Sequence, residues 1–245
     1  MGVRRSAILI EHGQSKYGIL PGTWPDVEAY ALFLQTPFGG AWRGDEIAIL
    51  RSPRRALVND LFAQMKKQCD LALVVFCGHG FFAHGRMYIR LNDGEYLAVD
   101  DVSPGTPRQM LVIDACRKYV EDGYVRVGLS EFVPSNVLHH PYMVSCRQLY
   151  DAAVMGADEG RSVMYACAAN QSAAENAHGG YFSRSLISTT QRFAETHRSG
   201  FIATRVISLP EAFLGAYTET RAKRYPQEPV LQNGRRVYSF PFAVA

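Results

Sequence analysis

The chain has 245 residues, of which 47% are hydrophobic and 20% are charged, and its formal net charge at pH 7 is +3. This composition is typical of a globular protein with a substantial core and excludes a disordered or fibrous chain. The basic residues are scattered, so we expect no nucleic-acid partner. The apolar runs are too short to span a bilayer, and the N-terminus lacks the apolar run of a signal peptide. We therefore expect no membrane association and a cytoplasmic location.

The five cysteines form no Cys-x-x-Cys pair. A chain of this size does not need disulfides to support its core, so we expect reduced thiols. Cys69, Cys77, Cys146 and Cys167 are interpreted as small buried hydrophobic residues. Cys116 differs from them, because it directly follows an apolar strand instead of lying within one.

Predicted strands and helices alternate through the first half of the chain. Strands are expected at 6–10, 46–50, 71–76 and 110–114, and helices at 23–35 and 53–67. Ser52 and Pro53 are interpreted as the N-cap and first-turn proline of the second helix. A hairpin, with strands at 86–91 and 95–97, is inserted before the fourth strand. The β-α-β-α-β order requires parallel neighbours in one sheet.

Residues 117–160 show no sustained period and are interpreted as long loops. Regular structure is expected again in a fifth strand at 162–168, in helices at 183–196 and 209–223, and in short extended pieces at 229–231 and 237–240. We expect a single α/β domain over residues 1–245.

Two predicted strands end at chemically reactive side chains. The run Val74-Val75-Phe76-Cys77-Gly78 leads to His79, and the run Leu111-Val112-Ile113-Asp114-Ala115 leads to Cys116. Neither run alternates with polar residues, as is typical of strands covered on both faces. Parallel strands carry their carboxyl ends to one edge of the sheet, where ligands bind. A thiol and an imidazole that share this edge are typical of a cysteine hydrolase.

The residues around these two positions resemble those of the caspase-like cysteine peptidases, and more the metacaspase and bacterial branch than the animal one. Ala115-Cys116-Arg117 fits the animal signature Gln-Ala-Cys-[Arg/Gln/Gly]-Gly, whereas Asp114 and Lys118 depart from it. An aspartate two residues before the cysteine is what metacaspase-like sequences carry. The segments 20–29 and 169–183 also resemble family segments, so the similarity covers nearly the whole chain.

The resemblance implies a caspase-like three-layer sandwich with a mostly parallel sheet of about six strands and helices on both faces. Residues 1–116 would be similar to the large subunit, 117–160 to the linker and 161–245 to the small subunit. His79 would act as the base and Cys116 as the nucleophile, and the backbone amides of Gly80 and Cys116 would form the oxyanion hole. Protein substrates would be cleaved through a thioester, and bacterial defence or programmed death would be the setting.

The resemblance also places two carboxylates, Asp26 and Asp114, in the pocket for the residue before the scissile bond. Such a pocket would select Arg or Lys and reject acidic side chains. The alternatives stay open, because Asp26 could serve the first turn of a helix and Asp114 could bind backbone amides. Asn170 or its neighbour stands where related sequences often have a further aspartate, which would make the pocket less acidic.

Other residues are weaker candidates. His84 is a rival base in the same predicted loop, but it follows Phe81-Phe82 and lacks the pair of glycines that flanks His79. His139-His140 and Cys146 match no zinc spacing, so no metal site is predicted. No cofactor is predicted either, and the resemblance leaves a calcium requirement open, since acidic residues near 121 and 158 are too sparse to define a site.

We expect residues 117–160 to control activity, either through an activating partner or through self-cleavage of a zymogen at Lys118, Arg126 or Arg147. A transpeptidase of the same clan is the alternative enzyme. The alternative that is not an enzyme is a catalytically silent caspase-fold scaffold or binding module, although a degenerate scaffold would be expected to have lost His79 or Cys116.

Overall fold

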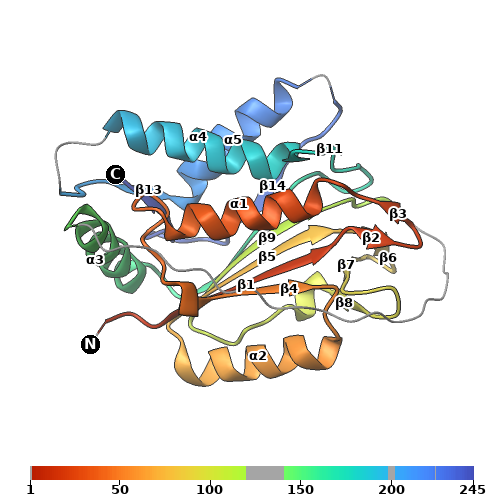
Figure 1. Ribbon diagram of the computed structural model, residues 1–245, viewed down its shortest axis with the longest axis horizontal. Helices are drawn as coiled ribbons and strands as arrows, with labels where there is room; N and C mark the ends of the chain where they lie inside the picture. Colours follow the sequence, from red (N-terminus) through yellow and green to blue (C-terminus); the bar gives the residue numbers. More distant parts are fainter. Residues whose placement is uncertain (1, 120–140, 198–201, 224) are drawn as a thin grey trace.

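A six-stranded sheet forms the centre of the molecule (Figure 1). The computed structural model describes residues 2–119, 141–197, 202–223 and 225–245. All neighbouring strands of the sheet are parallel except β14 and β10. In spatial order the strands are β14 (Val230–Gln232), β10 (Gly160–Tyr165), β9 (Arg108–Ala115), β5 (Leu71–Gly78), β1 (Arg5–His12) and β4 (Ile47–Arg51). The predicted mostly parallel sheet of about six strands is confirmed.

Alternate residues of the central strands point into two separate cores. In β1, Ala7 and Leu9 belong to the core on one face of the sheet, and Ile8 and Ile10 belong to the core on the other. Burial of each large aliphatic side chain contributes about 1.5–3 kcal/mol. This double coverage explains why the sequence of these strands is apolar without alternation.

Helices cover both faces of the sheet and complete three layers (Figure 1). The helices α1 (Thr23–Gln35), α4 (Tyr181–His197) and α5 (Leu209–Arg221) cover one face, and α2 (Arg55–Gln68) lies against the other. The bounds predicted for α1 are confirmed. The predicted cap of α2 is wrong, because α2 has no side-chain cap and its N-cap residue is Arg54. Ser52 instead has a positive φ of 45°, and its Oγ lies 2.9 Å from His12 Nδ1.

The structure differs from the sequence interpretation in a helix, α3 (Pro141–Gly156), within the region expected to be loop. Its residues Tyr142, Cys146, Tyr150 and Val154 recur every four positions and are all buried. This spacing is the apolar stripe of a helix, and the interpretation of 117–160 as continuous loop missed it. Residues 120–140 lie outside the described part of the chain.

The remaining strands form smaller sheets outside the central one. A three-stranded sheet consists of β6 (Gly80–Ala83), β7 (Arg86–Arg90) and β8 (Tyr96–Ala98). The two-stranded sheets are β2 (Gln14–Ser15) with β3 (Gly18–Ile19), β11 (Glu175–Asn176) with β12 (Gly179–Gly180), and β13 (Val206–Ser208) with β15 (Pro241–Val244). Two short 3₁₀ helices are η1 (Gly44–Glu46) and η2 (Val99–Asp101).

The predicted hairpin is confirmed, since β7 pairs with β8. The strand expected at 237–240 forms later, as β15. Within the described ranges, no helix has the length and apolar character needed to cross a membrane.

Candidate active site

The ends of β5 and β9 carry His79 and Cys116 to the same edge of the sheet. Gly78 of β5 is paired with Ala115 of β9, and His79 and Cys116 are the next residues of the two parallel strands. The following residue, Gly80, lies against the Cys116 backbone, because a Cβ atom at Gly80 would be 2.8 Å from the Cys116 carbonyl oxygen. Only glycine allows this close approach. The structure thus places His79 and Cys116 at the ends of neighbouring strands, with the Gly80 backbone against that of Cys116.

His79 is held by a backbone carbonyl in a defined orientation. Its Nε2 lies 3.1 Å from the carbonyl oxygen of Gly18, which can only accept a hydrogen bond. Nε2 therefore carries the proton, and in the neutral ring Nδ1 is the nitrogen that can accept one. The pKa of His79 is lowered overall, because the effect of burial exceeds the opposite effect of the Gly18 and Gly13 carbonyls. The ring is neutral near pH 7 and can act as a base.

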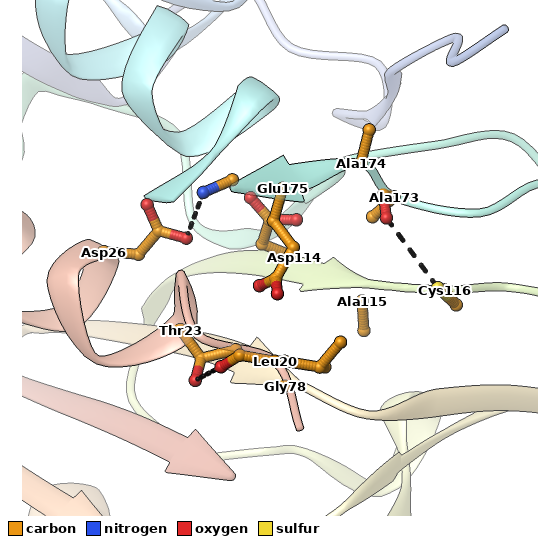
Figure 2. Close-up of a pocket in the computed structure, with 11 residues that line it drawn as sticks. Leu20, Thr23, Asp26, Gly78, Asp114, Ala115, Cys116, Ala173, Ala174 and Glu175 are labelled. Carbon is orange, nitrogen blue, oxygen red and sulfur yellow. Dashed lines mark hydrogen bonds between the residues drawn. The ribbon is translucent and has the colours of Figure 1, made fainter. Parts of the chain in front are cut away.

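Cys116 follows β9 in a partly buried position. Its Sγ lies 3.9 Å from the Ala173 carbonyl oxygen, a weak contact that Figure 2 shows. The next residue, Arg117, is buried, donates from Nη1 to the Cys167 carbonyl oxygen at 3.1 Å, and stacks 4.2 Å from the centre of the Tyr165 ring. Arg117 thus anchors the turn that presents the thiol.

A narrow cavity of about 20 Å³ lies beside Cys116 (Figure 2). Three carboxylate side chains line it, Asp26 from α1, Asp114 from β9 and Glu175 from β11. Its volume is that of one or two water molecules. A substrate side chain can enter only if the cavity widens.

Hydrogen bonds from the backbone and from a hydroxyl hold two of these carboxylates. Gly180 N donates to Asp26 Oδ2 at 2.8 Å, and Ser183 Oγ donates to Asp114 Oδ2 at 2.6 Å. Among the described residues, the buried Asp26 Oδ1 has no hydrogen-bond partner. An unmatched buried acceptor is costly, so this oxygen is suited to receive a donor from a bound molecule.

Burial and mutual repulsion disfavour the charged forms of the three acids. Burial, followed by the charge of Asp114, raises the pKa of Asp26, and burial also raises the pKa of Asp114. Burial and the charge of Asp114 raise the pKa of Glu175 to about 7. No ion pair joins any of the three to a basic side chain in the described ranges. A cationic ligand would supply the missing countercharge.

Glu175 is the cavity residue that the sequence interpretation missed. It stands five residues after Asn170, in the segment Gln171-Ser172-Ala173-Ala174-Glu175, and no local pattern marks it as a cavity residue. Asn170 itself is exposed, has a φ of 63°, and does not line the cavity. The cavity is therefore more acidic than the sequence suggested.

The weaker candidates do not join this site. His84 is exposed and lies in the turn between β6 and β7. Cys146 is buried in α3, and His139-His140 lie outside the described residues. In the part of the chain that the structure describes, no three His, Cys, Asp or Glu residues form a group that could hold a metal ion.

Comparison with known proteins identifies the family. A family model described as "Caspase domain" matches residues 4–233, nearly the whole chain. The chain belongs to the caspase family. No curated protein matches the sequence.

Comparison with solved structures also finds the caspase fold for this chain. The crystal structure of caspase-1 from Spodoptera frugiperda superposes with a TM-score of 0.60 and 16% sequence identity, over 96% of this chain and 89% of that one. The predicted caspase-like three-layer fold is thereby confirmed, and membership of the family supports a cysteine peptidase. The metacaspase and bacterial branch stays a prediction.

Proposed function

We propose that this caspase domain is a cysteine endopeptidase that cleaves protein chains after Arg or Lys. The observation that carries the proposal is that Cys116 lines a cavity with three carboxylates and follows the strand paired with the one that ends before His79. Cys116 and His79 provide a nucleophile and its base. The carboxylates provide a pocket for a positively charged side chain.

In the proposed reaction, the Cys116 thiol transfers its proton to His79 Nδ1 and the thiolate attacks the substrate carbonyl carbon. The backbone amides of Gly80 and Cys116 donate to the oxyanion that forms, and each such donor contributes roughly 3 kcal/mol. His79 then gives the proton to the leaving amine, so the peptide bond breaks and a thioester remains. Water, deprotonated by His79, attacks the thioester and releases the acid and the thiol.

The acidic cavity favours a basic residue before the scissile bond. The unpartnered Asp26 Oδ1 can accept from a guanidinium or ammonium group, and the arriving cation stabilises the ionised forms of Asp114 and Glu175. An acidic side chain would instead bring a further negative charge beside three buried acids. This repulsion gives the pocket its selectivity.

Regulation by residues 117–160 forms part of the proposal, and the narrow cavity supports a resting form that must open. Of the basic residues considered for self-cleavage, Lys118 is exposed at the end of the described segment. Arg126 lies outside the described residues. Arg147 is a poor site, because it lies in α3 and its Nη1 donates to Glu46 Oε2 at 2.9 Å. An activating partner, a cytoplasmic location and a role in bacterial defence or programmed death stay predictions.

The test is a panel of fluorogenic peptides that end in Arg, Lys, Asp or Leu, applied to the parent protein and to Cys116→Ala. We expect turnover of the Arg and Lys peptides, and its loss in the variant. Turnover that survives in Cys116→Ala, or a preference for Asp, would contradict the proposal. If no peptide is cleaved, thiol-reactive arginyl and aspartyl ketones with mass mapping decide between a resting peptidase and a scaffold, since a scaffold would not be labelled at Cys116.

A further inference from the structure

The turn between β7 and β8 brings a carboxylate against the β2–β3 hairpin. Asp93 Oδ1 accepts a hydrogen bond from Ser15 Oγ at 2.6 Å and from the backbone nitrogen of Lys16 at 3.3 Å. Although burial acts in the opposite direction, these hydrogen bonds lower the pKa of Asp93. The side chain is therefore ionised at neutral pH and fixes the first strand of the hairpin by two contacts.

The second strand of the same hairpin holds His79. The Gly18 carbonyl oxygen that accepts from His79 Nε2 belongs to β3, and Gly18 has a φ of 128°, which favours glycine. Between the two strands, the Tyr17 ring packs against the Arg90 guanidinium at 3.8 Å from the ring centre. The β2–β3 hairpin thus links Asp93, which bonds to its first strand and turn, to the His79 ring, which bonds to its second strand.

A second connection runs through His12, at the end of β1. His12 Nε2 lies 3.7 Å from Asp93 Oδ1, and its Nδ1 lies 2.9 Å from Ser52 Oγ. The His12 and His79 rings pack edge to face, with their centres 6.0 Å apart, and the His12 carbonyl accepts from the His79 backbone nitrogen at 3.2 Å. One carboxylate therefore contacts both structures that hold His79.

The turn that carries Asp93 is itself fixed. The Asn92 side chain accepts from the backbone nitrogens of Gly94 and Glu95 at 2.8 and 2.9 Å, and it donates to the Pro53 carbonyl oxygen at 2.9 Å. The buried Asn92 side chain closes this turn by hydrogen bonds, and these bonds fix the position of the neighbouring Asp93.

We propose that Asp93 is a positioning residue for His79, acting through the β2–β3 hairpin and through His12. The proposal rests on the proposed role of His79 as the catalytic base. It goes beyond that role, because Asp93 lies outside the acidic cavity and touches neither Cys116 nor the carboxylates of the pocket. A residue that only stabilised the hairpin would affect the melting temperature and leave the state of the His79 ring unchanged.

The first test compares Asp93→Ala and Asp93→Asn with Asp100→Ala in the peptide assay. Asp100 is a suitable control, because it is an exposed carboxylate of the adjoining η2 turn that pairs with Arg86. We expect Asp93→Ala to lower kcat about 10- to 100-fold with KM nearly unchanged, since a small displacement of a catalytic group has effects of this size. Asp93→Asn keeps the acceptor for Ser15 and Lys16 and should recover most of kcat. Unchanged kcat in Asp93→Ala would overturn the proposal.

The second test does not depend on turnover. In the Cys116→Ala background, the ring nitrogens of His79 are observed by ¹⁵N NMR and assigned by comparison with His79→Gln. Of the groups that face His79, the Gly18 and Gly13 carbonyls raise its pKa, as does Asp93, while Arg90 lowers it. His12, when protonated, would act in the same direction as Arg90, because the two rings are in contact.

In this experiment Asp93→Ala should lower the pKa of His79 and reduce the fraction of the form protonated at Nε2, and Asp100→Ala should change neither. Identical His79 signals in the two variants would overturn the positioning role. If the His79 signals shift as expected but the parent protein neither cleaves a peptide nor is labelled at Cys116 by the ketones, the proposed function fails and the positioning of the ring by Asp93 stands.

Discussion

Buried charges occur at both ends of the central sheet, and the two clusters differ in their balance. At the amino ends of the strands, the buried Arg5 lies 3.2 Å from Asp151 and 3.6 Å from Glu46, and Arg147 pairs with the same two carboxylates. At the carboxyl ends, Asp26, Asp114 and Glu175 line one cavity, and none of them forms an ion pair within the part of the chain that the structure describes. A balanced cluster fastens elements together, in this case β1 to α3. A cluster of buried charges of one sign is instead stabilised when a ligand of the opposite charge binds.

The largest expected effect is at the balanced cluster. Arg5→Ala leaves the carboxylates of Glu46 and Asp151 without their buried partner, so we expect the free energy of unfolding to fall by about 3–5 kcal/mol. Urea unfolding at pH 7 measures this loss of stability. The control is Arg4→Ala, because Arg4 is the exposed neighbour of Arg5 and pairs with Asp70. A loss of less than 1 kcal/mol would show that the Arg5 cluster is not needed for stability.

At the unbalanced cluster, the main effect should be on substrate selection. Asp26→Asn removes the carboxylate whose Oδ1 is unpartnered, so we expect kcat/KM for an arginyl peptide to fall about 100-fold, equivalent to about 3 kcal/mol. A citrullyl peptide, which has nearly the same shape without the charge, should be affected less than threefold. Equal losses for the two peptides would mean that Asp26 does not recognise charge.

The pH dependence of selectivity should follow Glu175. Its pKa is raised to about 7, so its charge appears as the pH rises through neutrality. The ratio of kcat/KM for arginyl over citrullyl peptides should increase between pH 6 and 8 by about threefold. Glu175→Gln should make the ratio independent of pH in this window, and a ratio that still rises would assign the titration to another group.

Glu175 should also have a small effect on the free energy of unfolding. The pKa of Glu175 is higher in the folded protein than its usual value of 4.5. The folded state therefore retains a proton that the unfolded state loses, and the cost of ionising Glu175 develops as the pH rises from about 4.5 to 7. Since Glu175 is only partly buried, solvent screening reduces this cost to about 1 kcal/mol. Glu175→Gln should stabilise the protein by this amount at pH 8 and have no effect at pH 4, as followed by urea unfolding.

The sequence predicted those parts of the structure that depend on local patterns. The apolar runs before His79 and Cys116 indicated two buried parallel strands, and the rule that parallel strands end at one edge was sufficient to bring these residues together. The bounds of α1 were predicted because its ends are marked by turn residues. The helix α3 was missed because its apolar spacing follows a segment without regular pattern.

Contacts between distant segments were not predictable from the sequence. Glu175 comes from a two-residue strand whose position depends on β12, and nothing local distinguishes it from a surface acid. Ser52 looked like a helix cap, yet its hydroxyl contacts His12. Asp93 looked like a turn residue, although its carboxylate reaches Ser15 across 78 positions of sequence. These roles arise from the packing of loops at the sheet edge, and only the structure reveals them.

The most direct test of the account is the rate at which Cys116 is alkylated by a peptidyl arginyl chloromethyl ketone, compared with its citrullyl counterpart. Mass mapping identifies the labelled cysteine, and Cys116→Ala provides the control. We expect modification at Cys116 alone, at least 30 times faster with the arginyl reagent, because charge recognition in the acidic cavity should contribute about 2 kcal/mol. Equal rates for the two reagents, or labelling of another cysteine in place of Cys116, would contradict this expectation.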